Sequence, residues 1–85
     1  MASVSQPVTI FSTPWCGYCV RLKHQLDALG VSYTEVDISE DPEAAELVVT
    51  VNRGLRTVPT VLFADGSTLT NPSAQQVLER AAACA

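Results

Sequence analysis

The sequence is poor in positive charge. It carries five Lys and Arg residues against nine Asp and Glu residues, which gives a net charge of −4 and a pI of about 4.6. Proteins with this charge balance are not expected to bind the phosphate backbone of nucleic acids or an anionic membrane surface. We therefore expect neither nucleic acid nor membrane among the partners of this chain.

Long apolar runs are also missing. No segment approaches the ~20 consecutive apolar residues that a membrane-spanning helix requires. Residues 1–7 contain no Lys or Arg and no extended apolar run, so they lack the pattern of a secretory signal peptide. We expect a soluble protein of the cytoplasm.

Cysteine is scarce as well, since the three cysteines are too few for the disulfide framework of a small secreted domain. Cys16 and Cys19 form a C-x-x-C pair, which in a reducing compartment is more often catalytic or metal-binding than structural. A structural zinc ion needs four ligands, and only His24 and Cys84 could complete the set. We therefore predict a redox dithiol without a metal, and we assign no role to Cys84.

The order of expected helices and strands indicates an α/β fold. Apolar periodicity and turn residues predict strands at 8–11, 32–38, 58–63 and 67–70, and helices from Cys16 to Gly30, from Asp41 to Asn52 and from Ser73 onward. Residues 48–51 are β-branched and would also suit a strand, but the Asp-Pro-Glu helix start at 41–43 favours a helix. The order β-α-β-α-β-β-α predicts one domain over residues 1–85, with a mixed sheet and helices on both faces.

The position of the two cysteines has a chemical reason. The thiolate is the form that attacks a disulfide, and a helix N-terminus favours an anion through its unpaired N–H groups and dipole. Cys16 is expected at that N-terminus, with Cys19 one turn later, where the two side chains can meet. We predict that Cys16 is the exposed nucleophile and that Cys19 is the more buried second thiol.

Other candidate residues allow two interpretations. Trp15, the lone tryptophan, and Tyr18 could form a rim that contacts substrates or could simply pack against the protein. Arg53 and Arg56 could attract an anionic group or belong to a solvated loop. The string Thr57-Val58-Pro59-Thr60 is by itself a weak signal, because proline at the start of a strand is common.

Taken together, the chain resembles the glutaredoxin branch of the thioredoxin-fold proteins. The resemblance covers nearly its full length and depends on Trp15-Cys16-Gly17-Tyr18-Cys19 and on Thr57-Val58-Pro59-Thr60. Residues 51–54 and 64–72 are most similar to the mycoredoxin subgroup, which works with mycothiol. The resemblance implies a four-stranded sheet and a cis Val58-Pro59 bond facing Cys16. It also implies that the Val58 backbone pairs with the incoming thiol.

Three departures from the glutaredoxin pattern bear on the substrate. Thr13 replaces the Lys or Arg often found before the nucleophile, and Gly17 replaces proline in the motif. The glutathione-binding Gly-Gly-x-Asp becomes the sequence at 70–73, Thr-Asn-Pro-Ser. These hydroxyl and amide groups suit a thiol that carries sugar hydroxyls, such as mycothiol. The substrate-binding residues that the resemblance suggests are Thr13, Trp15, Tyr18, Arg56, Thr57, Val58, Pro59, Ser67, Thr68, Thr70 and Asn71.

The function that we expect is the reduction of protein–mycothiol mixed disulfides by a monothiol mechanism through Cys16. Mycothiol would be a co-substrate, no cofactor would be tightly bound, and a mycothiol disulfide reductase that uses NADPH would recycle the thiol. S-mycothiolated proteins would be the clients of a monomeric enzyme. One alternative is a dithiol redoxin reduced directly by thioredoxin reductase, and another is a dimer that binds an iron–sulfur cluster.

Overall fold

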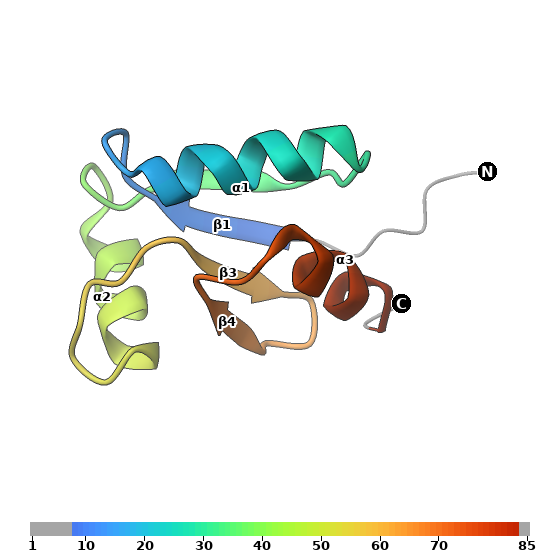
Figure 1. Ribbon diagram of the computed structural model, residues 1–85. Coiled ribbons are helices and arrows are strands. Elements are labelled where there is room, and N and C mark those ends of the chain that lie inside the picture. Colours follow the sequence, from blue (N-terminus) through green and yellow to red (C-terminus); the bar gives the residue numbers. More distant parts are fainter. Residues whose placement is uncertain (1–7, 84–85) are drawn as a thin grey trace.

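A computed structural model describes residues 8–83 of the chain (Figure 1). The elements follow the expected order: β1 (Val8–Ser12), α1 (Gly17–Ala28), β2 (Thr34–Asp37), α2 (Pro42–Val51), β3 (Thr60–Phe63), β4 (Thr68–Thr70) and α3 (Ala74–Ala83). The predicted β-α-β-α-β-β-α order is therefore confirmed. Cys84 lies outside the described residues.

The four strands form one mixed sheet in the order β2-β1-β3-β4. β1 pairs in parallel with β2, as the intervening helix predicts, and antiparallel with β3. β3 and β4 are antiparallel neighbours joined by a short turn. This arrangement is the thioredoxin-like fold, with β2 and β4 at the two edges of the sheet.

Three strands are shorter than the sequence predicts, and the last of them, β4, lacks only Ser67. Residues 32–38 were expected to be extended, but β2 ends at Asp37, whose carboxylate accepts hydrogen bonds from the amide and hydroxyl of Ser39 and so forms a turn. The third strand begins at Thr60 rather than Val58, because the chain makes a cis peptide bond between Val58 and Pro59 before it joins the sheet.

The helix ends agree with the local signals in the sequence. The Asp41 side chain accepts a hydrogen bond from the Ala44 amide at 3.1 Å, so residues 48–51 are helical despite their β-branched composition. Ser73 and Gln76 form the predicted capping box, since each side chain bonds the other residue's backbone amide.

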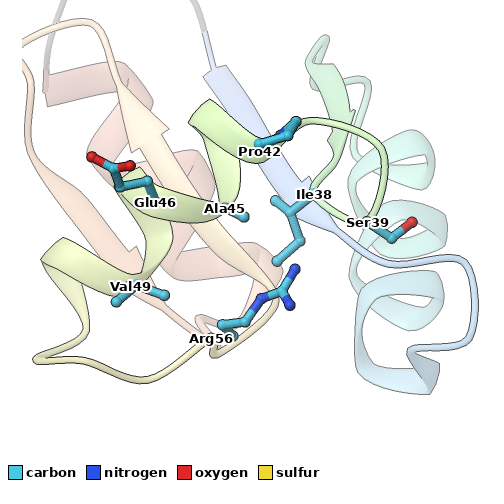
Figure 2. Close-up of a pocket in the computed structure, with 7 residues that line it drawn as sticks. All are labelled: Ile38, Ser39, Pro42, Ala45, Glu46, Val49 and Arg56. Atoms are coloured by element: carbon cyan, nitrogen blue, oxygen red, sulfur yellow. The ribbon is translucent and has the colours of Figure 1, made fainter.

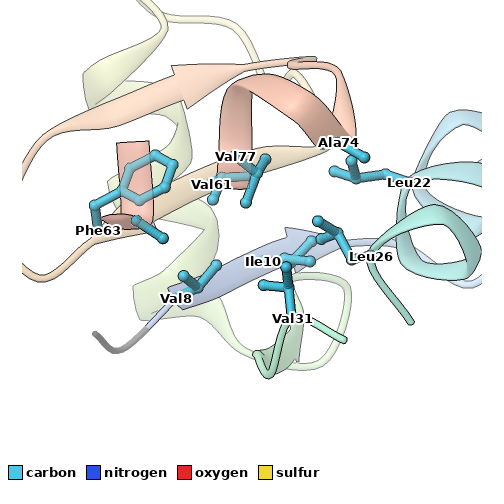
Figure 3. Close-up of a cluster of buried hydrophobic side chains, with 10 residues drawn as sticks. Val8, Ile10, Leu22, Leu26, Val31, Val61, Phe63, Ala74 and Val77 are labelled. Atoms are coloured by element: carbon cyan, nitrogen blue, oxygen red, sulfur yellow. The ribbon is translucent and has the colours of Figure 1, made fainter. Parts of the chain in front are cut away.

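The core has two halves, one on each face of the sheet. Alternate residues of a strand point to opposite faces, so Ile10 and Val61 face one side while Phe11 and Leu62 face the other. α1 and α3 cover the first face, where they bury an apolar cluster (Figure 3) of Val8, Ile10, Leu22, Leu26, Val31, Val61, Phe63, Ala74, Val77 and Ala81. α2 covers the second face through Ala44 and Val48. The prediction of helices on both faces is therefore confirmed.

None of the helices within residues 8–83 is both long and apolar enough to cross a membrane.

Candidate active site

The cysteine pair lies where β1 ends and α1 begins. β1 is almost fully buried, and it leads into the turn at residues 13–15. The Cys16 amide donates a hydrogen bond to the Thr13 carbonyl at 3.2 Å, which closes this turn. Cys16 is the N-cap residue of α1, and its Sγ accepts a hydrogen bond from the Cys19 amide at 3.2 Å. The helix N-terminus thus places an N–H donor on the sulfur, an arrangement that stabilises a thiolate.

The two sulfurs have different environments. Cys16 is partly exposed, whereas Cys19 is fully buried in the interior. Burial is the main cause that raises the pKa of Cys19 to about 12, and the side-chain hydrogen bond with Cys16 adds to it. A thiol with this pKa is protonated at neutral pH, so Cys16 is the sulfur that can react first with a substrate.

The loop before β3 faces the nucleophile, as the resemblance implies. The Val58–Pro59 bond is cis, and the Cys16 thiol lies 3.9 Å from the Val58 carbonyl oxygen, within reach of a weak hydrogen bond. Pro59 is buried, while Thr57 and Val58 are partly exposed beside Cys16. Thr13, also predicted for the site, is buried in the turn, and its Oγ1 has no partner among the described residues.

Two strongly exposed aromatic side chains lie within two residues of the nucleophile in the sequence. Trp15 is 76% exposed and Tyr18 is 64% exposed, although large aromatic residues are usually well covered. Of the two interpretations of these residues, the exposure favours the rim over internal packing. Trp15 and Tyr18 are therefore available for contact with a substrate.

Arg56 lines a hollow beside α2, between the residues that follow β2 and the loop before β3. The other lining residues are Ile38, Ser39, Pro42, Ala45, Glu46 and Val49. Figure 2 shows the Arg56 guanidinium directed toward Ile38, which packs in the same apolar cluster as Val58. Arg56 is exposed and is two residues from Val58, so it remains a candidate for contact with a substrate group.

Asn52 is a residue that the sequence analysis missed. Its side-chain amide donates hydrogen bonds to the Val48 carbonyl at 2.8 Å and to the Thr60 hydroxyl at 3.0 Å. Its Oδ1 accepts a hydrogen bond from the Thr70 hydroxyl. Thr60 in turn donates to the Thr57 carbonyl at 2.7 Å. Asn52 thus joins the end of α2 to the loop that faces Cys16, a connection that no local sequence signal reveals.

The substrate residues expected in and after β4 fall into two groups. Asn71 donates its backbone amide to the Pro59 carbonyl at 2.8 Å, so Thr70 and Asn71 lie beside the cis proline. Ser67 and Thr68 lie toward the other end of the sheet, because β3 runs antiparallel to β4 and Thr60 pairs with Thr70. Ser67 accepts a hydrogen bond from Arg80 of α3 at 3.0 Å. The structure does not bring Ser67 and Thr68 together with Cys16.

The described residues contain no group of three or more His, Cys, Asp or Glu side chains that could hold a metal ion.

Comparison with known proteins identifies the family. The model of the glutaredoxin family matches residues 8–68. The chain belongs to the glutaredoxin family. Mycoredoxin 1 of Corynebacterium glutamicum is 46% identical to it over 78 residues, which cover 92% of this chain and 96% of the relative. A Mycobacterium tuberculosis protein named as a candidate glutaredoxin is 60% identical over 74 residues, 87% of this chain and 88% of its own length.

A solved glutaredoxin has the same architecture. The buckwheat glutaredoxin–glutathione complex superimposes with a TM-score of 0.62 at 32% identity, covering 88% of this chain and 67% of that one. Family membership and the C-x-x-C pair at the start of α1 make this chain a glutaredoxin-like thiol–disulfide oxidoreductase. In this glutaredoxin the C-x-x-C pair has one partly exposed sulfur, Cys16, and one buried sulfur, Cys19.

Proposed function

We propose that this glutaredoxin reduces mixed disulfides between client proteins and mycothiol through Cys16 alone. The observation that carries the proposal is the asymmetry of the pair: Cys16 is partly exposed and accepts the Cys19 amide, while Cys19 is fully buried. The similarity to a mycoredoxin over nearly the whole of both chains supports mycothiol as the small thiol. We place this activity in the cytoplasm and in one domain over residues 1–85.

The reaction would proceed in two exchange steps. The Cys16 thiolate attacks the mycothiol sulfur of the mixed disulfide, a Cys16–mycothiol disulfide forms, and the client leaves as a thiolate that takes up a proton. A second mycothiol thiolate then attacks the mycothiol sulfur bound to Cys16 and releases Cys16 as a thiolate, with mycothiol disulfide as the product. A mycothiol disulfide reductase that uses NADPH would return this product to mycothiol.

The surroundings of Cys16 would hold the substrate in three ways. The Val58 backbone would pair with the peptide-like part of the incoming thiol. Thr70 and Asn71, beside the cis proline, would contact the sugar hydroxyls of mycothiol. Trp15 and Tyr18, both strongly exposed, would contact the client protein.

One structural observation favours a second candidate, a dithiol cycle. The Cys19 amide lies only 3.2 Å from Cys16 Sγ, so the second thiol is on the same turn as the nucleophile and can close a disulfide with it. A dithiol redoxin of this kind would receive electrons directly from thioredoxin reductase.

NADPH consumption with a mixed-disulfide substrate separates the two candidates. The protein is supplied with mycothiol and its reductase, with glutathione and its reductase, or with thioredoxin reductase alone. The monothiol proposal predicts turnover only in the mycothiol arm, retained in Cys19→Ser and absent in Cys16→Ser. Turnover only with thioredoxin reductase, lost in Cys19→Ser, would establish the dithiol cycle instead.

A further inference from the structure

A polar cluster formed by Ser12, Lys23 and Glu35 joins three elements next to the cysteine pair. Glu35 Oε2 on β2 accepts a hydrogen bond from the Ser12 hydroxyl at 2.7 Å, at the end of β1. The same oxygen forms an ion pair with Lys23 Nζ of α1 at 2.6 Å. Ser12 is 1% exposed, and the side chain of Lys23 is 23% exposed. The Glu35 side chain is 39% exposed, so the ion pair lies at the surface above the buried Ser12 hydroxyl.

Lys23 is also a neighbour of the second cysteine. It follows Cys19 by four residues in α1, so the two side chains lie on the same face of the helix, one turn apart. Burial is the largest of the causes that raise the pKa of Cys19 to about 12, followed by the hydrogen bond and the charge of Cys16. The Thr13 backbone and the charge of Lys23 act in the opposite direction.

The influences on the ionisation of Cys19 change when Cys16 is bound to a substrate through a disulfide. In a mixed disulfide Cys16 has no thiolate, so its charge no longer opposes the ionisation of Cys19. Among the described residues, Lys23 is then the charged side chain that acts on Cys19. Glu35 offsets part of the Lys23 charge through their ion pair. The negative charge of Asp37, on the same strand, acts to raise the pKa of Glu35. Removing the Lys23 charge should therefore disfavour the ionisation of Cys19, and removing the Glu35 charge should favour it.

We propose that Lys23 and Glu35 are positioning residues that set how fast Cys19 attacks a mixed disulfide on Cys16. Lys23 favours the Cys19 thiolate, and Glu35 limits this effect by holding the ammonium group. The pair thereby determines how often a thiol bound to Cys16 is expelled by Cys19 before a second small thiol arrives. This inference deepens the proposed function and applies to the same site.

The chemical step needs no outside oxidant or reductant. The Cys19 thiol gives its proton to solvent, and the thiolate attacks Cys16 Sγ of the mixed disulfide. The bond between Cys16 and Cys19 forms, the bond between Cys16 and the bound thiol breaks, and that thiol leaves with the electron pair and takes up a proton. The disulfide is transferred, so the number of oxidised sulfurs is unchanged.

Ellman's reagent measures this step directly. In a Cys84→Ser background, the first coloured thiolate is released when the reagent modifies Cys16, and the second when Cys19 expels the aromatic thiol from Cys16. Stopped-flow absorbance gives the rate of the second phase as a function of pH. We expect Lys23→Met to slow this phase and Glu35→Gln to speed it, whereas Lys23→Arg should retain the wild-type rate.

The expected change in the rate of the second phase follows from two opposing effects. Lowering a thiol pKa by one unit raises the thiolate fraction about tenfold below that pKa, while the nucleophilicity falls by roughly threefold, which leaves about a threefold change in rate. Arg21→Met is the control, because it removes the same charge from an exposed side chain on α1.

Opposite shifts of the second phase in the two variants, with Arg21→Met unchanged, support the inference. Any other pattern overturns it, including a parallel loss in both variants, which would indicate a purely structural ion pair. Circular dichroism and the amplitude of the first phase verify that each variant is folded. The assay contains no mycothiol, so its outcome is independent of the small thiol that the enzyme uses, which the NADPH assay tests.

Discussion

The side-chain amide of Asn52 donates a hydrogen bond to the hydroxyl of Thr60 at 3.0 Å. Asn52 follows the last residue of α2, and Thr60 is the first residue of β3, directly after the cis proline. Asn52 also accepts the Thr70 hydroxyl, so one side chain connects α2, β3 and β4. The loop that faces Cys16 is thus held by this polar contact in addition to the packing of Val58 against the apolar cluster under α2.

Asn52→Ala should therefore weaken both the fold and the site. The substitution removes the donor to the Val48 carbonyl and to Thr60, which is itself fully buried, and such a loss costs about 1–3 kcal/mol. Urea unfolding should show this loss, and KM for a mixed disulfide should rise. Thr50→Ala is the control, because the Thr50 hydroxyl bonds only within its own helix, to the Glu46 carbonyl. Equal stability of the two variants would contradict the bracing role of Asn52.

The two reactive-site cysteines should differ strongly in alkylation. With a pKa of about 12 against an ordinary value of 9.0, Cys19 has roughly a thousandfold lower thiolate fraction at about pH 8. Brief treatment with iodoacetamide should therefore label Cys16 and leave Cys19 unmodified. Peptide mapping by mass spectrometry measures both sites in one sample, and comparable labelling of Cys19 in the folded protein would disprove its buried, protonated state.

Glu35 should stabilise the folded protein at neutral pH, and this contribution should be lost in acid. The ion pair with Lys23 and the hydrogen bond from Ser12 hold the pKa of Glu35 below its ordinary value of 4.5. A lowered pKa contributes stability above the unfolded-state value, and this contribution is lost as pH falls through the folded-state value. Below about pH 4.5, the free energy of unfolding should thus fall more steeply in wild type than in Glu35→Gln. Chemical denaturation at a series of pH values tests this, with Glu40→Gln, an exposed carboxylate, as the charge control.

Trp15→Ala should affect client binding with little effect on stability. The side chain is 76% exposed, and exposed substitutions usually change the free energy of unfolding by no more than about 0.5 kcal/mol. An aromatic residue buried against a partner contributes roughly 1–2 kcal/mol, so KM for a protein disulfide should rise by about 5- to 30-fold. Leu29→Ala, an exposed apolar residue after the other end of α1, is the matched control. An unchanged KM in Trp15→Ala would remove Trp15 from the client-binding surface.

Local signals in the sequence were sufficient for the order of the elements and for the reactive pair. Asp41 and Ser73 begin helices because their side chains accept hydrogen bonds from backbone amides a few residues away, and such contacts depend little on the rest of the fold. The C-x-x-C spacing places Cys19 one turn after Cys16 whenever the segment is helical. These signals indicate a redox dithiol, while the glutaredoxin family was indicated by the resemblance of residues 15–19 and 57–60 to that family.

The tertiary structure alone decided which distant residues meet. The register of β3 with β4 pairs Thr70 with Thr60, near the cis proline. Ser67 precedes Thr70 by only three residues, but the same register places it far from the cis proline. The parallel pairing of β1 with β2 brings Glu35 to Ser12 and Lys23, and the end of α2 brings Asn52 to Thr60. These contacts join residues whose relative positions depend on strand register and helix packing, and no local pattern in the sequence specifies those quantities.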